Sequence, residues 1–212
     1  MGITKLIDHE SSLSIVKSFH EGLVSHRRAR VLSALLASLI PSESTILDVG
    51  CGNGMVAHLL ERLNPTLEIE GLEVMPRSSC LIKCRSFDGE TIPLSDQSVD
   101  VCMFVDVLHH TTDMEKALKE ARRVSRQYLL IKDHLCENKF DIATLSFMDW
   151  VGNRADGVSL PYNYKSKAQW HRILSECGLR ITHWDQRLSL YPRPFNSLFG
   201  RNLHFIGLFK MA

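Results

Sequence analysis

The chain has 212 residues, of which 44% are hydrophobic, and its formal net charge at pH 7 is +1. This length is enough for one domain that buries a sizeable core. A charge so close to zero supplies no basic face of the kind that neutralises many phosphates, so we expect no nucleic-acid substrate. The start MGITKLIDHE lacks an apolar signal core, and no long apolar run follows it. We therefore expect a cytoplasmic protein without a membrane span.

The opening residues follow a helical pattern. Between residues 27 and 41, the sequence RRARVLSALLASLIP places apolar residues three and four positions apart until Pro41 ends the pattern. This spacing predicts an amphipathic helix that leads into the first strand.

The stretch ILDVGCGNG at 46–54 is the most informative part of the chain. A buried apolar strand runs directly into Gly50, Gly52 and Gly54. Glycines permit a tight turn and let main-chain amides approach a ligand at the start of the next helix. The pattern therefore predicts a nucleotide-type pocket. Asp48, inside the strand, can take the ammonium end of a ligand or hydrogen-bond the loop amides.

The residues around this loop bear on which nucleotide it binds. Met55 stands where the dinucleotide-binding pattern asks for a glycine or alanine, which makes a nicotinamide cofactor the disfavoured alternative. A second strand, residues 67–74, ends in Glu73, about twenty residues beyond the glycines. A carboxylate at that place can accept both hydroxyls of a ribose, or it can be merely solvated.

Apolar strands alternate with helical patterns along the middle of the chain. This alternation predicts a doubly wound α/β fold, with a parallel sheet covered by helices on both sides. Residues 74–87 contain Pro76 and are too few for a full crossover helix with its loops, so we expect a shortened crossover there. The strands are expected at 45–50, 67–74, 99–107 and 127–134, and the helices at 53–63 and from about Asp113 onward.

The six cysteines form no C-x-x-C pair. Cys80 and Cys84 are four positions apart, and no matching pair of histidines or cysteines lies nearby to complete a tetrahedral zinc site. We interpret the cysteines as reduced structural thiols and predict no metal site.

Several motifs in order resemble one family. The loop DVGCGNG, the segment FDGETIPLSDQSVDVCMFVDVLHH at 87–110 and Glu73 between them resemble the class I S-adenosylmethionine-dependent methyltransferases of the small-molecule type. The resemblance covers residues 44–134. It implies a Rossmann-like, mostly parallel seven-stranded sheet whose last strand is antiparallel. We expect one methyltransferase domain over 1–212, with N-terminal helices (1–43), a cofactor-binding core (44–134), a helical and loop cap after the fifth strand (135–170), and a C-terminal helix and strands (171–212).

The same resemblance implies S-adenosylmethionine as the cofactor. The glycine loop would take its methionine end, the end of the second strand its ribose, the acidic turn near residue 88 its adenine side, and the end of the fourth strand its carboxylate or sulfonium. The implied cofactor-binding residues are Asp48, Gly50, Cys51, Gly52, Asn53, Gly54, Glu73, Val74, Asp88, Gly89, Asp106 and His109.

Aromatic and amide residues gather after the fifth strand, at 147–170. We expect a helix from about Asp141 to Val151, then a loop, then a helix over 167–176 that is capped by Ser166. An insertion at the carboxyl edge of the sheet is placed to cover an acceptor. The alternative is that its aromatic side chains form a small core of the cap itself. The acceptor candidates are Trp150, Asn153, Tyr162 and Tyr164.

Two histidines are candidates for a general base, because the ordinary pKa of histidine lies near neutrality. His110 follows the fourth strand and His134 ends the fifth, so both lie where the strand ends meet. Either can instead be a hydrogen-bonded loop residue. We predict methyl transfer to a small-molecule acceptor, with oxygen favoured over nitrogen or carbon. The alternative is a catalytically silent cofactor-binding subunit that regulates a partner protein, and the pattern predicts no particular oligomeric state.

Overall fold

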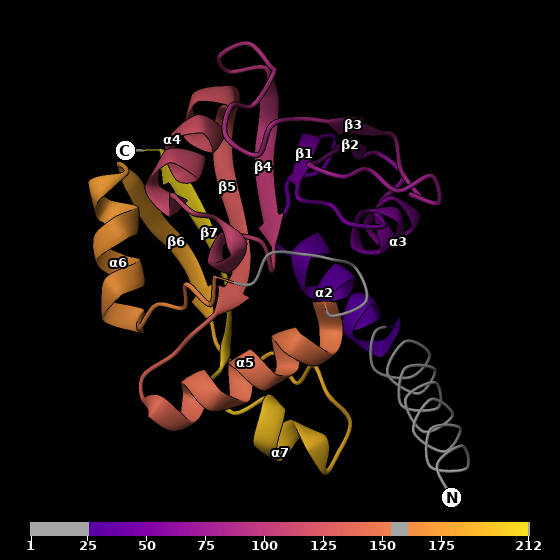
Figure 1. The fold of residues 1–212 in the computed structure, drawn as a ribbon. Coiled ribbons are helices and arrows are strands. Elements are labelled where there is room, and N and C mark those ends of the chain that lie inside the picture. The colour runs from indigo at the N-terminus through magenta and orange to yellow at the C-terminus, as the bar shows by residue number, and fades with distance from the viewer. Residues whose placement is uncertain (1–25, 154–160, 212) are drawn as a thin grey trace, which may run out of the picture.

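The computed structural model describes residues 26–153 and 161–211 (Figure 1). Residues 1–25, which hold part of the expected N-terminal helices, and 154–160 of the expected cap lie outside the described residues. The helices are α2 (His26–Ala37), α3 (Met55–Leu63), α4 (Met114–Val124), α5 (Lys139–Asn153), α6 (Lys167–Glu176) and α7 (Phe195–Phe199), with a 3-10 turn, η2, at Leu108–His110. The strands are β1 (Thr45–Val49), β2 (Glu68–Glu73), β3 (Cys84–Ser86), β4 (Val99–Val105), β5 (Ser125–His134), β6 (Leu179–Asp185) and β7 (His204–Met211).

The strands form one seven-stranded sheet in the order β3-β2-β1-β4-β5-β7-β6. The pairs from β3 to β5 are parallel, whereas β7 is antiparallel to both of its neighbours. The predicted doubly wound sheet with an antiparallel last strand is therefore confirmed. The strand order reverses between β1 and β4, and ligands bind at the carboxyl ends of the strands beside such a reversal.

Successive residues of the central strands serve two cores, one on each face of the sheet. In β4, Cys102 and Phe104 pack with α4 and α6, whereas Val101 and Met103 pack with α2 and α3. This alternation follows from the two-residue repeat of a strand. Figure 1 shows α4 and α6 together on one side and α2 beside α3 on the other.

Two helix starts follow from local chemistry. The Asp113 side chain accepts a hydrogen bond from the amide of Lys116 and so caps α4. Ser166 caps α6 as predicted, since its hydroxyl accepts from the amide of Gln169. The Gln169 side chain in turn accepts from the Ser166 amide, which completes a capping box. Because both caps are encoded within four residues, sequence reasoning locates these helix starts well.

The crossover between β2 and β3 holds no helix, as its short length predicted. It consists of turns and bends that lead into the three-residue strand β3, which pairs with Gly71–Glu73 of β2. Among the described residues, no helix is both long and apolar enough to span a lipid bilayer.

Candidate active site

The glycine loop follows β1 and turns through three positive φ angles, +74° at Gly50, +58° at Gly52 and +72° at Gly54. The amides of Gly50 and Cys51 both donate to the carbonyl of Leu72, at 2.7 and 3.1 Å, which fastens the loop to β2. A Cβ on Gly52 would meet no atom within 4 Å, so the loop borders open space at this residue. Only glycine adopts such angles without strain, and here it leaves main-chain atoms accessible to a ligand.

Asp48 lies under this loop with 3% of its surface exposed. Its Oδ1 atom is buried without a hydrogen-bond partner. Burial, aided by the nearby charge of Glu73, raises the pKa of Asp48 to about 7. Since the loop amides are bonded to Leu72 and Glu73, this Oδ1 atom does not brace the loop. An orphaned carboxylate oxygen of this kind fits a cationic ligand group.

Glu73 ends β2 beside the loop. Its Oε2 accepts from the amide of Gly52 at 2.8 Å, and its Oε1 accepts from the amide of Val74 at 2.9 Å. A carboxylate has about four acceptor positions, so two remain for hydroxyl groups of a ligand. Asp88 is turned to its own loop, where its Oδ1 accepts from the amides of Glu90 and Thr91, both at 2.7 Å. These bonds lower the pKa of Asp88.

Among the other predicted cofactor residues, Gly89 follows Asp88 with a φ of +82°. The side chain of Val74 is 52% exposed at the end of β2. In the loop itself, Asn53 accepts from the amide of Met55 at 3.1 Å, and its carbonyl accepts from the amide of Leu81 at 3.0 Å. The structure thus brings the predicted loop, β2 and acidic-turn residues to one edge of the sheet.

Asp106 follows β4 in a left-handed conformation, with φ +59°. Its carboxylate forms ion pairs with Arg28 from α2 and with Lys132, which is fully buried in β5. Although burial alone would raise the pKa of Asp106, these two cations hold it well below its ordinary value. Burial lowers the pKa of Lys132 to about 8. The strained backbone at Asp106 is therefore held in place by two charged partners.

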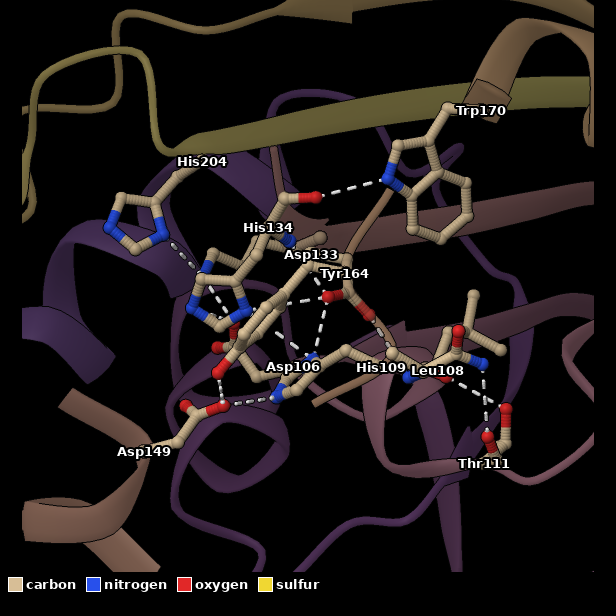
Figure 2. Close-up of polar contacts among 12 residues, drawn as sticks. Asp106, Leu108, His109, Thr111, Asp133, His134, Asp149, Tyr164, Trp170 and His204 are labelled. Atoms are coloured by element: carbon tan, nitrogen blue, oxygen red, sulfur yellow. Dashed lines mark hydrogen bonds and ion pairs between the residues drawn. The ribbon is translucent and has the colours of Figure 1, made fainter. Parts of the chain in front are cut away.

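A second set of buried charges surrounds His109 (Figure 2). Its Nδ1 lies 2.6 Å from Oδ1 of Asp133, and its Nε2 lies 3.4 Å from Oδ2 of Asp149. Burial lowers the pKa of His109, but the two carboxylates outweigh burial and raise it to about 10. His109 is therefore an imidazolium at neutral pH. It lies inside this ion cluster with 1% of its surface exposed, rather than on an open face of the cofactor loop.

His134 lies against His109, with the two Nδ1 atoms 3.3 Å apart. Burial, together with the positive charges of His109 and Lys132, lowers its pKa, and its carbonyl accepts from Nε1 of Trp170 at 3.0 Å. His204 of β7 contacts both residues, with 4.9 Å between its ring centroid and that of His134 and 3.2 Å between its Nδ1 and Nζ of Lys132. His134 is therefore a neutral member of a fully packed network.

His110 differs from the other histidines of the cluster. It is only partly buried, and its Nδ1 is enclosed without a hydrogen-bond partner. Burial and the charge of His109 lower the pKa of His110 to about 4. The ring is thus neutral at pH 7.

The cap contributes aromatic side chains from two segments. The Tyr164 hydroxyl donates to Asp149 of α5, and its ring lies 5.7 Å from that of His109. Tyr162, with φ +53°, lies 6.2 Å from the Tyr164 ring and is 40% exposed. Trp150 is 45% exposed and stacks on Phe147. Asn153 ends α5, and its side chain lies outside the described part of the chain.

Sequence reasoning named Asp106 and His109 as candidate site residues but missed the charged partners that surround them. Arg28 is 78 positions from Asp106, and no local pattern connects the two. The predicted strand QYLLIKDH carried one available signal, since lysine and aspartate are rarely buried unless paired. Asp149 and Asp133 likewise gain their roles only through the packing of α5 and β5 around His109.

Part of the chain is similar in sequence to known methyltransferases. Residues 47–128 match the family described as "Methyltransferase domain". A demethylmenaquinone methyltransferase of Thermotoga maritima is 31% identical over 113 residues, which make up 50% of this chain and 48% of that protein. The matched stretches span less than half the length of the curated relatives.

Solved structures share the fold over almost the whole chain. A chain in a complex of the Haloferax volcanii Trm112 methyltransferase activator with a methyltransferase has a TM-score of 0.66 and 13% identity, with 94% of both chains covered. A SAM-dependent methyltransferase of Thermotoga maritima has a TM-score of 0.62 and 18% identity, with 98% of this chain and 97% of that one covered. These identities support the fold alone.

Proposed function

We propose that this chain transfers a methyl group from S-adenosylmethionine to a small-molecule acceptor. Residues 47–128 match the methyltransferase domain family, and the chain has the class I S-adenosylmethionine-dependent methyltransferase fold. The observation that carries the proposal is the glycine loop with Asp48 beneath it and Glu73 beside it.

The residues of this edge fit the cofactor in three respects. The unpartnered Oδ1 of buried Asp48 suits an ammonium group, and the two remaining acceptor positions of Glu73 suit ribose hydroxyls. The open space beside Gly52 leaves room for the ligand between them. We assign Asp48, Gly50, Cys51, Gly52, Asn53, Gly54, Glu73, Val74, Asp88 and Gly89 to cofactor binding.

When bound, S-adenosylmethionine supplies a methyl group already activated on a sulfonium sulfur. The chain's own residues therefore need to align an acceptor and accept its proton. We assign the proton to the ring of His110, because this ring is neutral at pH 7 and, unlike that of His134, is only partly buried. A hydroxyl acceptor loses its proton as the oxygen–carbon bond forms, so a neutral imidazole at the acceptor favours O-methylation in this proposal.

His134 has a different role in this proposal. Its ring is enclosed by His109, Asp133 and Lys132, so it orients the cluster and does not reach the acceptor. We assign Asp106 and His109 to the same cluster, at the sulfonium end of the site. Tyr162, Tyr164, Trp150 and Asn153 would surround a planar acceptor.

Two of the similar proteins suggest which acceptor this chain methylates and which partner it binds. The curated relative that acts on demethylmenaquinone favours a small organic acceptor for this chain. The similarity to a chain in the Trm112 complex raises a protein activator as a second candidate partner. The six free cysteines suit a reducing compartment, and we propose the cytoplasm.

The test is transfer of a labelled methyl group from S-adenosylmethionine to a panel of phenols, quinols and amines, with each acceptor run against its methylated form as a blank. The proposal expects label on at least one hydroxyl acceptor. Label on amines alone would refute O-methylation. Transfer to none, with cofactor bound and with a Trm112-type activator added, would favour the silent subunit.

A further inference from the structure

Three cysteines meet beside the glycine loop. Cys51 belongs to the loop, Cys80 lies in the crossover between β2 and β3, and Cys84 is the first residue of β3. The sulfurs of Cys51 and Cys84 are 3.5 Å apart, and all three sulfurs lie within 4.8 Å of one another. Each of these residues is partly exposed. The fold therefore supplies the third thiol that the sequence spacing lacks.

The main chain fixes these positions from two sides. Cys84 lies opposite Gly71 in the ladder between β2 and β3. The amide of Cys51 donates to the carbonyl of Leu72, the next residue of β2. The amide of Leu81, next to Cys80, donates to the carbonyl of Asn53 in the glycine loop at 3.0 Å. Cys51 and Cys84 are thus held against Gly71 and Leu72 of β2, and the segment of Cys80 is held against the glycine loop.

Two glycines leave room for the sulfurs. A Cβ on Gly71 would lie 2.5 Å from Sγ of Cys51, closer than real contacts allow. A Cβ on Gly54 would lie 3.1 Å from Sγ of Cys80. A side chain at Gly71 would therefore clash with the sulfur of Cys51, and one at Gly54 would crowd the sulfur of Cys80. The two sulfurs can lie close together because both positions are glycine.

We propose that Cys51, Cys80 and Cys84 bind one Zn²⁺-type cation as thiolates, with the fourth coordination position open to a non-protein ligand. Zinc–sulfur bonds of about 2.3 Å in tetrahedral geometry place sulfurs about 3.8 Å apart, which small shifts of these residues achieve. Thiolates select zinc, cadmium and copper(I) over magnesium or calcium. Binding releases the thiol protons to solvent, one for each thiolate formed.

The surrounding charges are consistent with such an ion. Burial and the carboxylate of Asp48 raise the pKa of Cys51, and burial is the main cause of the raised pKa of Cys84. The carboxylate of Asp48 acts on Cys51 and that of Glu73 acts on Cys84, so both attract a positive ion to the cluster. The bound ion would join the glycine loop to the crossover and to β3. This site does not depend on methyl transfer.

The test uses the full chain, treated with chelator and kept reduced with a non-thiol reductant. Titration with Cd²⁺ should produce thiolate-to-metal charge-transfer absorption that saturates at one ion per chain and is reversed by Zn²⁺. Zn²⁺ alone should raise the unfolding temperature. Cys80→Ser and Cys84→Ser should each weaken Cd²⁺ binding about tenfold or more, whereas Cys136→Ser, away from the cluster, should match the unmutated chain.

A second readout needs no variant. Zn²⁺ should protect Cys51, Cys80 and Cys84 of the unmutated chain from alkylation, mapped by mass spectrometry, while Cys136 is alkylated equally with and without the ion. The proposal fails if the absorption is absent, if it persists in the Cys80→Ser/Cys84→Ser double variant, or if alkylation of the three cysteines is unchanged by Zn²⁺.

Discussion

Replacing Asp48 by asparagine should stabilise the ligand-free protein and weaken cofactor binding at the same time. The carboxylate is buried, and its Oδ1 has no hydrogen-bond partner. Burial therefore raises the pKa of Asp48 from its ordinary value of 3.8 to about 7. Between these two values the folded state binds more protons than the unfolded state, so stability from this group falls as pH rises and is lowest above pH 7.

The magnitude follows from linkage. With a pKa of about 7 in the folded state and 3.8 in the unfolded state, ionised Asp48 costs about 4 kcal/mol at pH 8 and about 1.7 kcal/mol at pH 5. Asparagine has no such titration. The stability of Asp48→Asn relative to the unmutated chain should therefore rise by about 2–3 kcal/mol between pH 5 and pH 8.

Urea denaturation at both pH values measures this difference, and titration calorimetry with S-adenosylhomocysteine at pH 8 measures binding. The loss of a charged partner for the ammonium group should weaken binding by about 1.5–3 kcal/mol. Asp100→Asn is the matched control, because Asp100 is paired with Arg126 and Thr45 and its pKa is lowered, so its removal should destabilise the protein. A pH-independent stability difference, or unchanged affinity, would refute the reasoning for Asp48.

Three further outcomes test the site. Glu73→Ala should weaken S-adenosylhomocysteine binding by about 1–3 kcal/mol in calorimetry. Glu70→Ala is the control and should not weaken binding, because Glu70 lies on the same strand but is paired with Arg85. Equal affinities of the two variants would remove Glu73 from the cofactor site. His110→Ala should keep cofactor affinity while methyl transfer to an identified acceptor falls about a hundredfold, and full turnover would end its role as base. His109→Gln should lower the free energy of unfolding most at pH 6, because the stability from the raised pKa of His109 is complete below pH 6.5 and is lost towards pH 10. An equal loss of unfolding free energy at pH 6 and pH 10, measured by denaturation, would contradict the ion cluster.

The elements that sequence reasoning located are those with strong local signals. Apolar runs such as 99–105 and the side-chain caps at Asp113 and Ser166 are encoded within a few residues. In contrast, β3 has only three residues, Cys84–Ser86, and α7 has only five, so both are too short to show a hydrophobic period.

The candidate site divides in the same way. The glycine loop and Glu73 are recognisable because the turn requires glycine and the strand end requires a carboxylate acceptor. The ion cluster is not recognisable, because Arg28, Asp106 and Asp149 come from elements far apart in the chain and acquire their partners only when these pack. The third thiol of the cysteine cluster was missed for the same reason, since Cys51 is 33 positions from Cys84.

The most direct test of the central claim is a thermal unfolding titration with S-adenosylhomocysteine, with NAD as the control. A ligand at a hundred times its dissociation constant adds about 2.7 kcal/mol of stability. The account predicts a rise in unfolding temperature with S-adenosylhomocysteine alone, and a smaller rise for Glu73→Ala at the same ligand concentration. A rise with NAD, or no rise with either ligand, would contradict it.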